Sequence, residues 1–151
     1  LQTVNYVDLD RYAGKWYEVA SFPNRFQKGC VGSTATYILK KSHIDVVNEC
    51  YDQSFQGKKR SAEGKAWVAK DYKTSSKLRV RFFWPFSGDY WVIGLDDKYE
   101  WALVGDPRRR YLWVLSRNPI LQPEIYQKIL FIATQQGFDT SKLVKTKQNN
   151  H

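Results

Sequence analysis

Short segments of strand-forming residues recur about every ten residues along the first three quarters of this sequence, with turn-forming residues between them. This spacing is typical of an antiparallel sandwich or barrel rather than a parallel sheet. Eight antiparallel strands closed on themselves would leave an interior wide enough for one small ligand. The expected strands are 14–22, 33–40, 43–51, 61–69, 77–84, 90–96, 99–105 and 111–117.

The hydrophobic period becomes helical in the last quarter of the chain. Pro123 suits the first turn of a helix and Gly137 suits its end, with apolar residues at helical spacing between them. We therefore expect one helix over about 123–136, packed on the outside of the barrel. A short edge strand is expected within 143–147. The prediction is a single all-β domain over residues 1–151: an eight-stranded antiparallel up-and-down barrel with one C-terminal helix.

The composition excludes some classes of protein but leaves several classes of binding partner open. A hydrophobic content of 42% and an aromatic content of 16% exclude a disordered chain. The net charge of +9 predicts a basic surface, which is compatible with nucleic acid, an anionic membrane or anionic small molecules. No apolar run reaches the ~20 residues that a membrane-spanning helix needs.

Two cysteines, Cys30 and Cys50, allow a single disulfide. A hairpin centred near Lys41 and Ser42 would place Cys30 opposite about position 53, so the two cysteines lie close but slightly out of register. A bridge closing about 20 residues would stabilise the fold by about 3 kcal/mol and would indicate an oxidising compartment. Two free, buried thiols are the alternative.

Alternation along 77–84 separates two faces of that strand. Arg79 and Arg81 share one face and must lie in water, so the other face points into the barrel. The inward residues are Leu78, Val80 and Phe82.

The same alternation places Asn48 on the inward face with Val46, opposite Asp45. An amide that faces an apolar lumen needs a hydrogen-bond partner. A ligand head group, a water molecule or Tyr37 would each serve.

The loops 23–32, 52–60, 85–89 and 106–110 share one end of an up-and-down barrel, because alternate connections lie together. An apolar throat under a basic rim suits an amphiphile with an anionic head, and we expect the arginines of 106–110 to attract an anionic ligand or membrane surface. The opposite end is also basic, so a generally basic, solvated surface is the alternative. The principal rim residues are Arg25, Lys28, Arg108, Arg109 and Arg110.

Two stretches of the chain carry a family resemblance. Residues 8–20 read Asp-Leu-Asp-Arg-Tyr-Ala-Gly-Lys-Trp-Tyr-Glu-Val-Ala, and residues 112–119 read Leu-Trp-Val-Leu-Ser-Arg-Asn-Pro. Both resemble the lipocalins, in particular the branch of the bacterial lipocalins and apolipoprotein D. The resemblance implies that Trp16, which follows Gly14, plugs the narrow end of the barrel and that Arg117 lies across its ring.

The resemblance also implies which aromatic residues line the cavity where both faces of a strand are apolar: Tyr37, Tyr90 and Trp113, together with Trp67. Members of this branch bind fatty acids, lysophospholipids or other small apolar molecules, and several bacterial members are outer-membrane lipoproteins. We therefore expect binding, transport or storage of such a ligand by a monomer or weak homodimer. The expected location is the periplasm, the outer membrane or the extracellular space.

The residues that catalysis or metal binding would need are poorly placed. His43 lies in an expected turn and His151 ends the chain, so neither can complete a catalytic triad or a metal cluster in the lumen. We expect no metal, no cofactor and no enzyme activity, with a lipocalin-type enzyme acting on a lipid as the alternative. Nucleic-acid binding through the basic surface is a further alternative, but eight strands and inward-facing aromatics argue against it.

Overall fold

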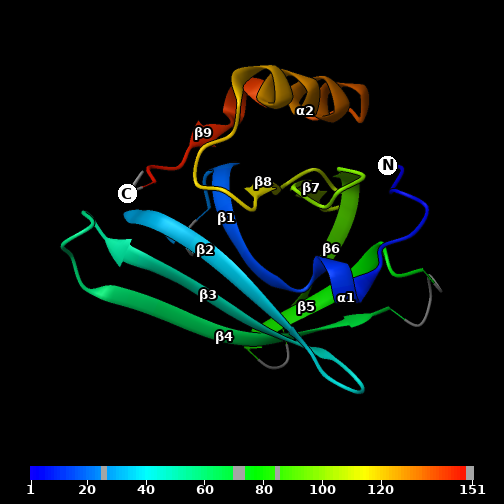
Figure 1. The fold of residues 1–151 in the computed structure, drawn as a ribbon, viewed down its shortest axis with the longest axis horizontal. Helices are drawn as coiled ribbons and strands as arrows, with labels where there is room; N and C mark the ends of the chain where they lie inside the picture. The colour runs from blue at the N-terminus through cyan, green and yellow to red at the C-terminus, as the bar shows by residue number, and fades with distance from the viewer. Residues whose placement is uncertain (25–26, 70–73, 84–85, 149–151) are drawn as a thin grey trace.

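The strand-forming segments pair in chain order and close into a barrel (Figure 1). The computed structural model describes residues 1–24, 27–69, 74–83 and 86–148. Its elements are α1 (Leu9–Tyr12), β1 (Gly14–Ser21), β2 (Cys30–Leu39), β3 (Ile44–Asp52), β4 (Lys59–Val68), β5 (Lys77–Phe83), β6 (Phe86–Leu95), β7 (Trp101–Gly105), β8 (Leu112–Ser116), α2 (Pro123–Gln135), a short 3-10 helix η2 (Thr140–Lys142) and β9 (Val144–Lys145).

The barrel closes through β1, which pairs with β8 on one side and with β2 on the other. All neighbouring strands run antiparallel, so the predicted eight-stranded up-and-down barrel is confirmed. The ninth described strand, β9, pairs with β1 beyond the end of the β1–β2 ladder.

Alternation along the strands produces two hydrophobic clusters, one on each side of the barrel wall. The inner cluster includes Trp16, Val46 and Val104, whereas the outer cluster includes Leu103 and Val114 beneath α2. Every residue of β7 is buried, because its inner face lines the barrel and its outer face lies under the helix. Figure 1 shows α2 across β7 and β8, on the side of the barrel away from β3 and β4.

The helix forms where the sequence predicts it. Pro123 occupies the first turn, Ile129 and Ala133 are buried against the barrel, and Gly137 follows the helix with a φ of 88°. That positive φ is readily adopted by glycine, which explains why the helix ends there. The predicted outer helix is thus confirmed, one residue shorter than 123–136.

Two strands begin three or more residues before their predicted start, and one short helix was not predicted. β2 begins at Cys30 rather than 33, because a bulge between Val31 and Thr34 lets the strand continue through Gly32. β6 begins at Phe86, inside the expected loop 85–89, because it continues the hairpin with β5. The helix α1 was not predicted, since its four residues are too few to show a helical period.

The predicted disulfide between Cys30 and Cys50 is present, with 5.5 Å between the two Cα atoms. Cys30 lies opposite Asp52 in the β2–β3 ladder, close to the expected position 53. Among the helices that the structure describes, none is long and apolar enough to cross a membrane.

Candidate functional site

A Trp–Arg plug closes one end of the barrel. Trp16 is fully buried, its Nε1 donates to the Tyr12 carbonyl at 2.8 Å, and the Arg117 guanidinium lies 3.8 Å above its ring. Gly14 has a φ of 104°, and a Cβ there would lie 3.3 Å from the Arg117 Nη1 atom. The guanidinium stacks on the ring while its hydrogens reach backbone oxygens, which a lysine could not do. Those oxygens belong to Arg11, Tyr12, Ala13, Lys15 and Tyr99.

Three tyrosines form the floor of the lumen above this plug. The hydroxyl oxygens of Tyr12 and Tyr90 lie 2.6 Å apart, and the Tyr90 hydroxyl donates to that of Tyr37 at 2.8 Å. Burial raises the pKa of Tyr37 to about 12, and it raises the pKa values of Tyr12 and Tyr90 well above the usual value. The floor is therefore a neutral, internally hydrogen-bonded aromatic surface at ordinary pH.

The interior is filled near the floor and open near the other end. Along the inner face of β3, Val46 is 2% exposed whereas Asn48 is exposed. Along the inner face of β4, Ala66 is 2% exposed whereas Ala62, directly opposite Asn48, is exposed. Solvent therefore reaches inward-facing positions in the half of the barrel away from the plug, which we call the upper half.

The expected cavity residues of β5 and β6 lie on the inner side of the wall. Leu78 and Tyr90 are opposite each other and buried in the inner cluster near the floor. Val80 and Phe82 are half-buried higher up, packed against that cluster. A Cβ on Gly64 would come within 2.6 Å of the Phe82 ring, so glycine allows the ring to approach β4 closely.

Trp113 lies on the inner face of β8, opposite Val104 of the inner cluster. It is half-buried, stacks on Tyr111 with 5.7 Å between ring centroids, and donates from Nε1 to the Gln27 side-chain oxygen at 3.2 Å. Gln27 belongs to the loop between β1 and β2, so this bond connects the barrel wall to that loop.

The expectation that Trp67 lines the cavity is wrong. Trp67 lies opposite Arg79 in the β4–β5 ladder and therefore shares the outward face with the arginines. The Arg81 guanidinium lies 5.6 Å from the Trp67 ring centroid on that outer surface. The side chain that precedes it, Ala66, is the inward one.

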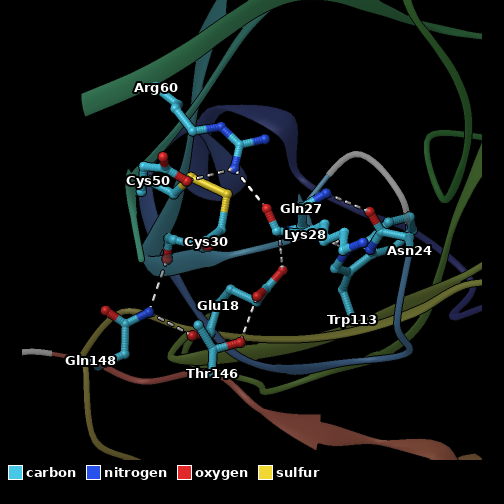
Figure 2. Close-up of a disulfide and its surroundings, with 12 residues drawn as sticks. Glu18, Asn24, Gln27, Lys28, Cys30, Cys50, Arg60, Trp113, Thr146 and Gln148 are labelled. Atoms are coloured by element: carbon cyan, nitrogen blue, oxygen red, sulfur yellow. Dashed lines mark hydrogen bonds and ion pairs between the residues drawn. A yellow bond between two sulfur atoms is a disulfide. The ribbon is translucent and has the colours of Figure 1, made fainter. Parts of the chain in front are cut away.

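A buried carboxylate, Glu18, faces inward beside Trp113. Glu18 is 6% exposed and accepts hydrogen bonds from the Gln27 amide, at 2.6 Å, and from the Thr146 hydroxyl. Burial raises the pKa of Glu18, although both hydrogen bonds lower it. Figure 2 shows that these residues come from three separate parts of the chain and lie beside the Cys30–Cys50 disulfide.

The residues of the predicted basic rim make different contacts. Arg109 donates from Nε to the Gln136 carbonyl at 2.7 Å and thus contacts the end of α2, while Arg110 lies 3.4 Å from the Asp106 carboxylate. Arg108 and Lys28 are exposed. Arg25 lies outside the described residues. The three consecutive arginines therefore do not act as one set of free side chains.

Residues 7–148 match the sequence model of the lipocalin-like domain family. The chain is a lipocalin. It is 45% identical over 146 residues to the outer membrane lipoprotein Blc of Citrobacter freundii, covering 96% of this chain and 81% of that protein. It is 40% identical to temperature-induced lipocalin-1 of Arabidopsis thaliana, covering 99% and 84%, and 34% identical to apolipoprotein D of Bos taurus, covering 95% and 78%. The predicted membership of the bacterial lipocalin and apolipoprotein D branch is confirmed.

Solved structures agree on the fold of this lipocalin. Insecticyanin from the tobacco hornworm Manduca sexta superposes with a TM-score of 0.80 at 22% identity, covering 99% of this chain and 85% of that one. Apocrustacyanin C2 superposes with a TM-score of 0.78 at 18% identity, covering 94% and 80%. At such identities the likeness supports the shared barrel alone.

No group of three or more His, Cys, Asp or Glu side chains is placed to hold a metal ion in the part of this lipocalin that the structure describes. His43 pairs with Asp45 at 2.8 Å in the turn before β3. The imidazole is therefore part of a local turn contact.

Sequence reasoning missed Glu18 and its partners Gln27 and Thr146. A signal for Glu18 was available, because it stands two residues after Trp16 on the same strand and so shares the inward face of the plug residue. The contacts with Gln27 and Thr146 join residues 9 and 128 positions away, and no local pattern predicts them.

Proposed function

We propose that this lipocalin binds and carries a small hydrophobic ligand, a fatty acid, lysophospholipid or similar amphiphile, in the open half of its barrel. The observation that carries the proposal is the contrast along the inner faces of β3 and β4. Val46 and Ala66 are buried near the floor, but Asn48 and Ala62 remain exposed although they face inward. An acyl chain occupying this space would gain about 0.8 kcal/mol per buried methylene before ordering costs.

The ligand's apolar chain would contact the half-buried side chains of Val80, Phe82 and Trp113 and end on the tyrosine floor. We further propose a binding role rather than an enzymatic one. The inward tyrosine hydroxyls are bonded to one another, and their raised pKa values make them poor bases at neutral pH. The proposed locations are the cell envelope and the extracellular space, because relatives include outer membrane lipoproteins.

Adjacent residues of β4 offer a matched test of where the ligand lies. Ala62 faces inward and Ser61 faces outward, and both are exposed. An Ala62→Trp side chain would narrow the lumen, whereas Ser61→Trp would add the same bulk outside it. After delipidation, we expect A62W to bind oleate and oleoyl-lysophosphatidylcholine at least ~10-fold more weakly than wild type by native mass spectrometry, and S61W to bind normally.

Both variants should keep the wild-type circular dichroism spectrum, since each position is accessible. Unchanged binding by A62W, or equal losses in A62W and S61W, would overturn the proposed site.

A further inference from the structure

A cavity of about 680 Å³ lies between the upper part of β1, the start of β2 and the C-terminal segment. Ten of the fifteen described residues that line it carry polar or charged side chains, whereas the inner wall around Val80 and Phe82 is apolar. The lining includes Glu18, Ser21, Gln27, Ser33 and Thr146.

The cavity exists because β1 and β2 separate near this end of the barrel. Their ladder ends at the pair Tyr17 and Thr34, so the next two residues, Glu18 and Ser33, are not joined by backbone hydrogen bonds. The side-chain amide of Gln148 instead donates to both of their carbonyl oxygens, at 2.7 and 2.9 Å (Figure 2). Both side chains remain on the inward face of their strands.

The Glu18 carboxylate has unused capacity to accept hydrogen bonds. It receives one bond on each oxygen, from Gln27 and Thr146, while two carboxylate oxygens offer about four acceptor positions. In the described part of the chain no lysine, arginine or histidine forms an ion pair with it. A buried charge held only by neutral donors is costly, and a further donor or a cation would offset that cost.

Ser33 supplies a second, independent observation. Its side chain is 4% exposed, and its Oγ atom has no hydrogen-bond partner among the described residues. A buried hydroxyl without a hydrogen-bond partner destabilises the folded protein. Because Ser33 lines the same cavity as Glu18, a polar group bound there would satisfy both side chains.

Lysines also border the cavity, but at its exposed margin. Lys28, Lys145 and Lys147 are all exposed, and the Lys145 ammonium lies 4.9 Å from the Tyr126 ring on the outer side of the barrel. Charges in water are screened and attract any anion weakly, so the buried groups decide which head group fits.

We infer that this cavity receives the polar head of the ligand and selects a head that donates hydrogen bonds, a hydroxyl or a primary ammonium, over a free carboxylate. The inference rests on the proposed function, because the attached chain must occupy the lumen. The donor bonds to Glu18 and Ser33, whereas an ionised carboxylate would be repelled by the Glu18 carboxylate.

Three ligands with the same 18-carbon chain, oleylamine, oleyl alcohol and oleate, differ only in the head group. Their dissociation constants are measured at pH 8 on delipidated, disulfide-bonded protein. We expect wild type to bind the amine and the alcohol at least ~10-fold more tightly than oleate. The net charge of +9 alone would favour oleate, so this order would oppose the general electrostatic attraction.

Glu18→Gln keeps the shape of the side chain and removes its charge. Its oxygen can still accept from Gln27, and its NH2 group can donate to the Thr146 hydroxyl in place of the bond that Glu18 accepts. It should reduce the preference for oleylamine over oleate to ~3-fold or less. Ser33→Ala removes no hydrogen bond among the described residues and should weaken binding of oleyl alcohol. The exposed, outward-facing Ser61→Ala is the matched control and should change neither result.

Oleate binding as tight as oleylamine in wild type, or an unchanged ratio in E18Q, would overturn the inference and leave the proposed function standing. Failure of all three compounds to bind would instead overturn the proposed function, and this inference with it.

Discussion

The tyrosine floor shows how this lipocalin buries polar atoms without charge. Tyr12, Tyr37 and Tyr90 each place a hydroxyl among apolar side chains, and each hydroxyl bonds to another within the set. A buried hydroxyl without a partner would cost about 1–3 kcal/mol. Tyr90 bonds to both of the others, so removing its hydroxyl would leave both Tyr12 and Tyr37 without their partner in this set.

The raised tyrosine pKa values predict a loss of stability at alkaline pH. Burial raises the pKa of Tyr37 from its ordinary value of 10.0 to about 12 in the folded protein. The stability that this shift contributes is fully present below pH ~10 and is lost as the pH rises through about 12. We expect the free energy of unfolding, measured in urea, to fall across this window.

Tyr37→Phe tests whether Tyr37 causes this loss of stability, because it changes how the free energy of unfolding depends on pH. The variant should be less stable at pH 7, because Tyr90 loses an acceptor, but its stability should fall by about 2 kcal/mol less between pH 10 and 12. Parallel curves for wild type and Y37F would contradict the prediction.

The orientation of some individual side chains could be predicted from the sequence. Arg79 and Arg81 must face water, which identified the inward side of β5, and the structure puts Val80 and Phe82 there. The same argument applies to Trp67 once the register is known, because it lies opposite Arg79. Strand register depends on distant pairing, so the resemblance alone misplaced this residue.

Among the elements, α2 stabilises the barrel through a few residues on one side. Ile129 and Ala133 are fully buried in the outer cluster, whereas Phe131, two residues after Ile129, is 65% exposed. The helix thus covers the outer face of β7 and β8 with a narrow apolar stripe.

Ile129→Ala should lower the free energy of unfolding by about 2–4 kcal/mol, because it removes buried methyl groups and leaves a cavity between helix and sheet. Phe131→Ala on the same helix should change it by less than about 0.5 kcal/mol, since the ring is exposed. Urea unfolding followed by circular dichroism measures both. Equal losses in the two variants would mean that the helix stabilises the barrel through its own helicity rather than through this stripe.

The elements were predictable where residue patterns are local. Alternation and turn residues indicated all eight barrel strands, and the helical period indicated α2 between Pro123 and Gly137. The extension of β2 back to Cys30 was not predictable, because it depends on a bulge and on the Gly32 amide bonding to the Lys147 carbonyl at 2.7 Å. The cavity around Glu18 has the same origin, since its walls come from opposite ends of the chain.

At the scale of the whole molecule, the barrel is closed in two different ways. Near the plug, β1 and β2 pair directly over Gly14 to Tyr17. Towards the open end they separate, and residues 144–148 fill the gap by pairing with β1 and bonding to β2. The closure near the plug is made by barrel strands alone, whereas the closure towards the open end depends on the C-terminal segment.

Truncation after Leu143 should therefore loosen only the upper closure. It removes the β9 pairing with Ala20 and Ser21, the acceptor of the Gly32 amide, the Thr146 bond to Glu18 and the two bonds of the Gln148 bridge. At about 1 kcal/mol per lost hydrogen bond, we expect the free energy of unfolding to fall by about 4–6 kcal/mol. Hydrogen exchange should accelerate at 18–21 and 31–33 and remain slow at 14–17, where the plug is intact. Gln148→Ala, which removes only the bridging amide, should give a smaller change at the same sites. Loss of protection throughout the barrel would show instead that the C-terminal segment is required for closure as a whole, and no change at 18–21 would show that it contributes nothing to the upper wall.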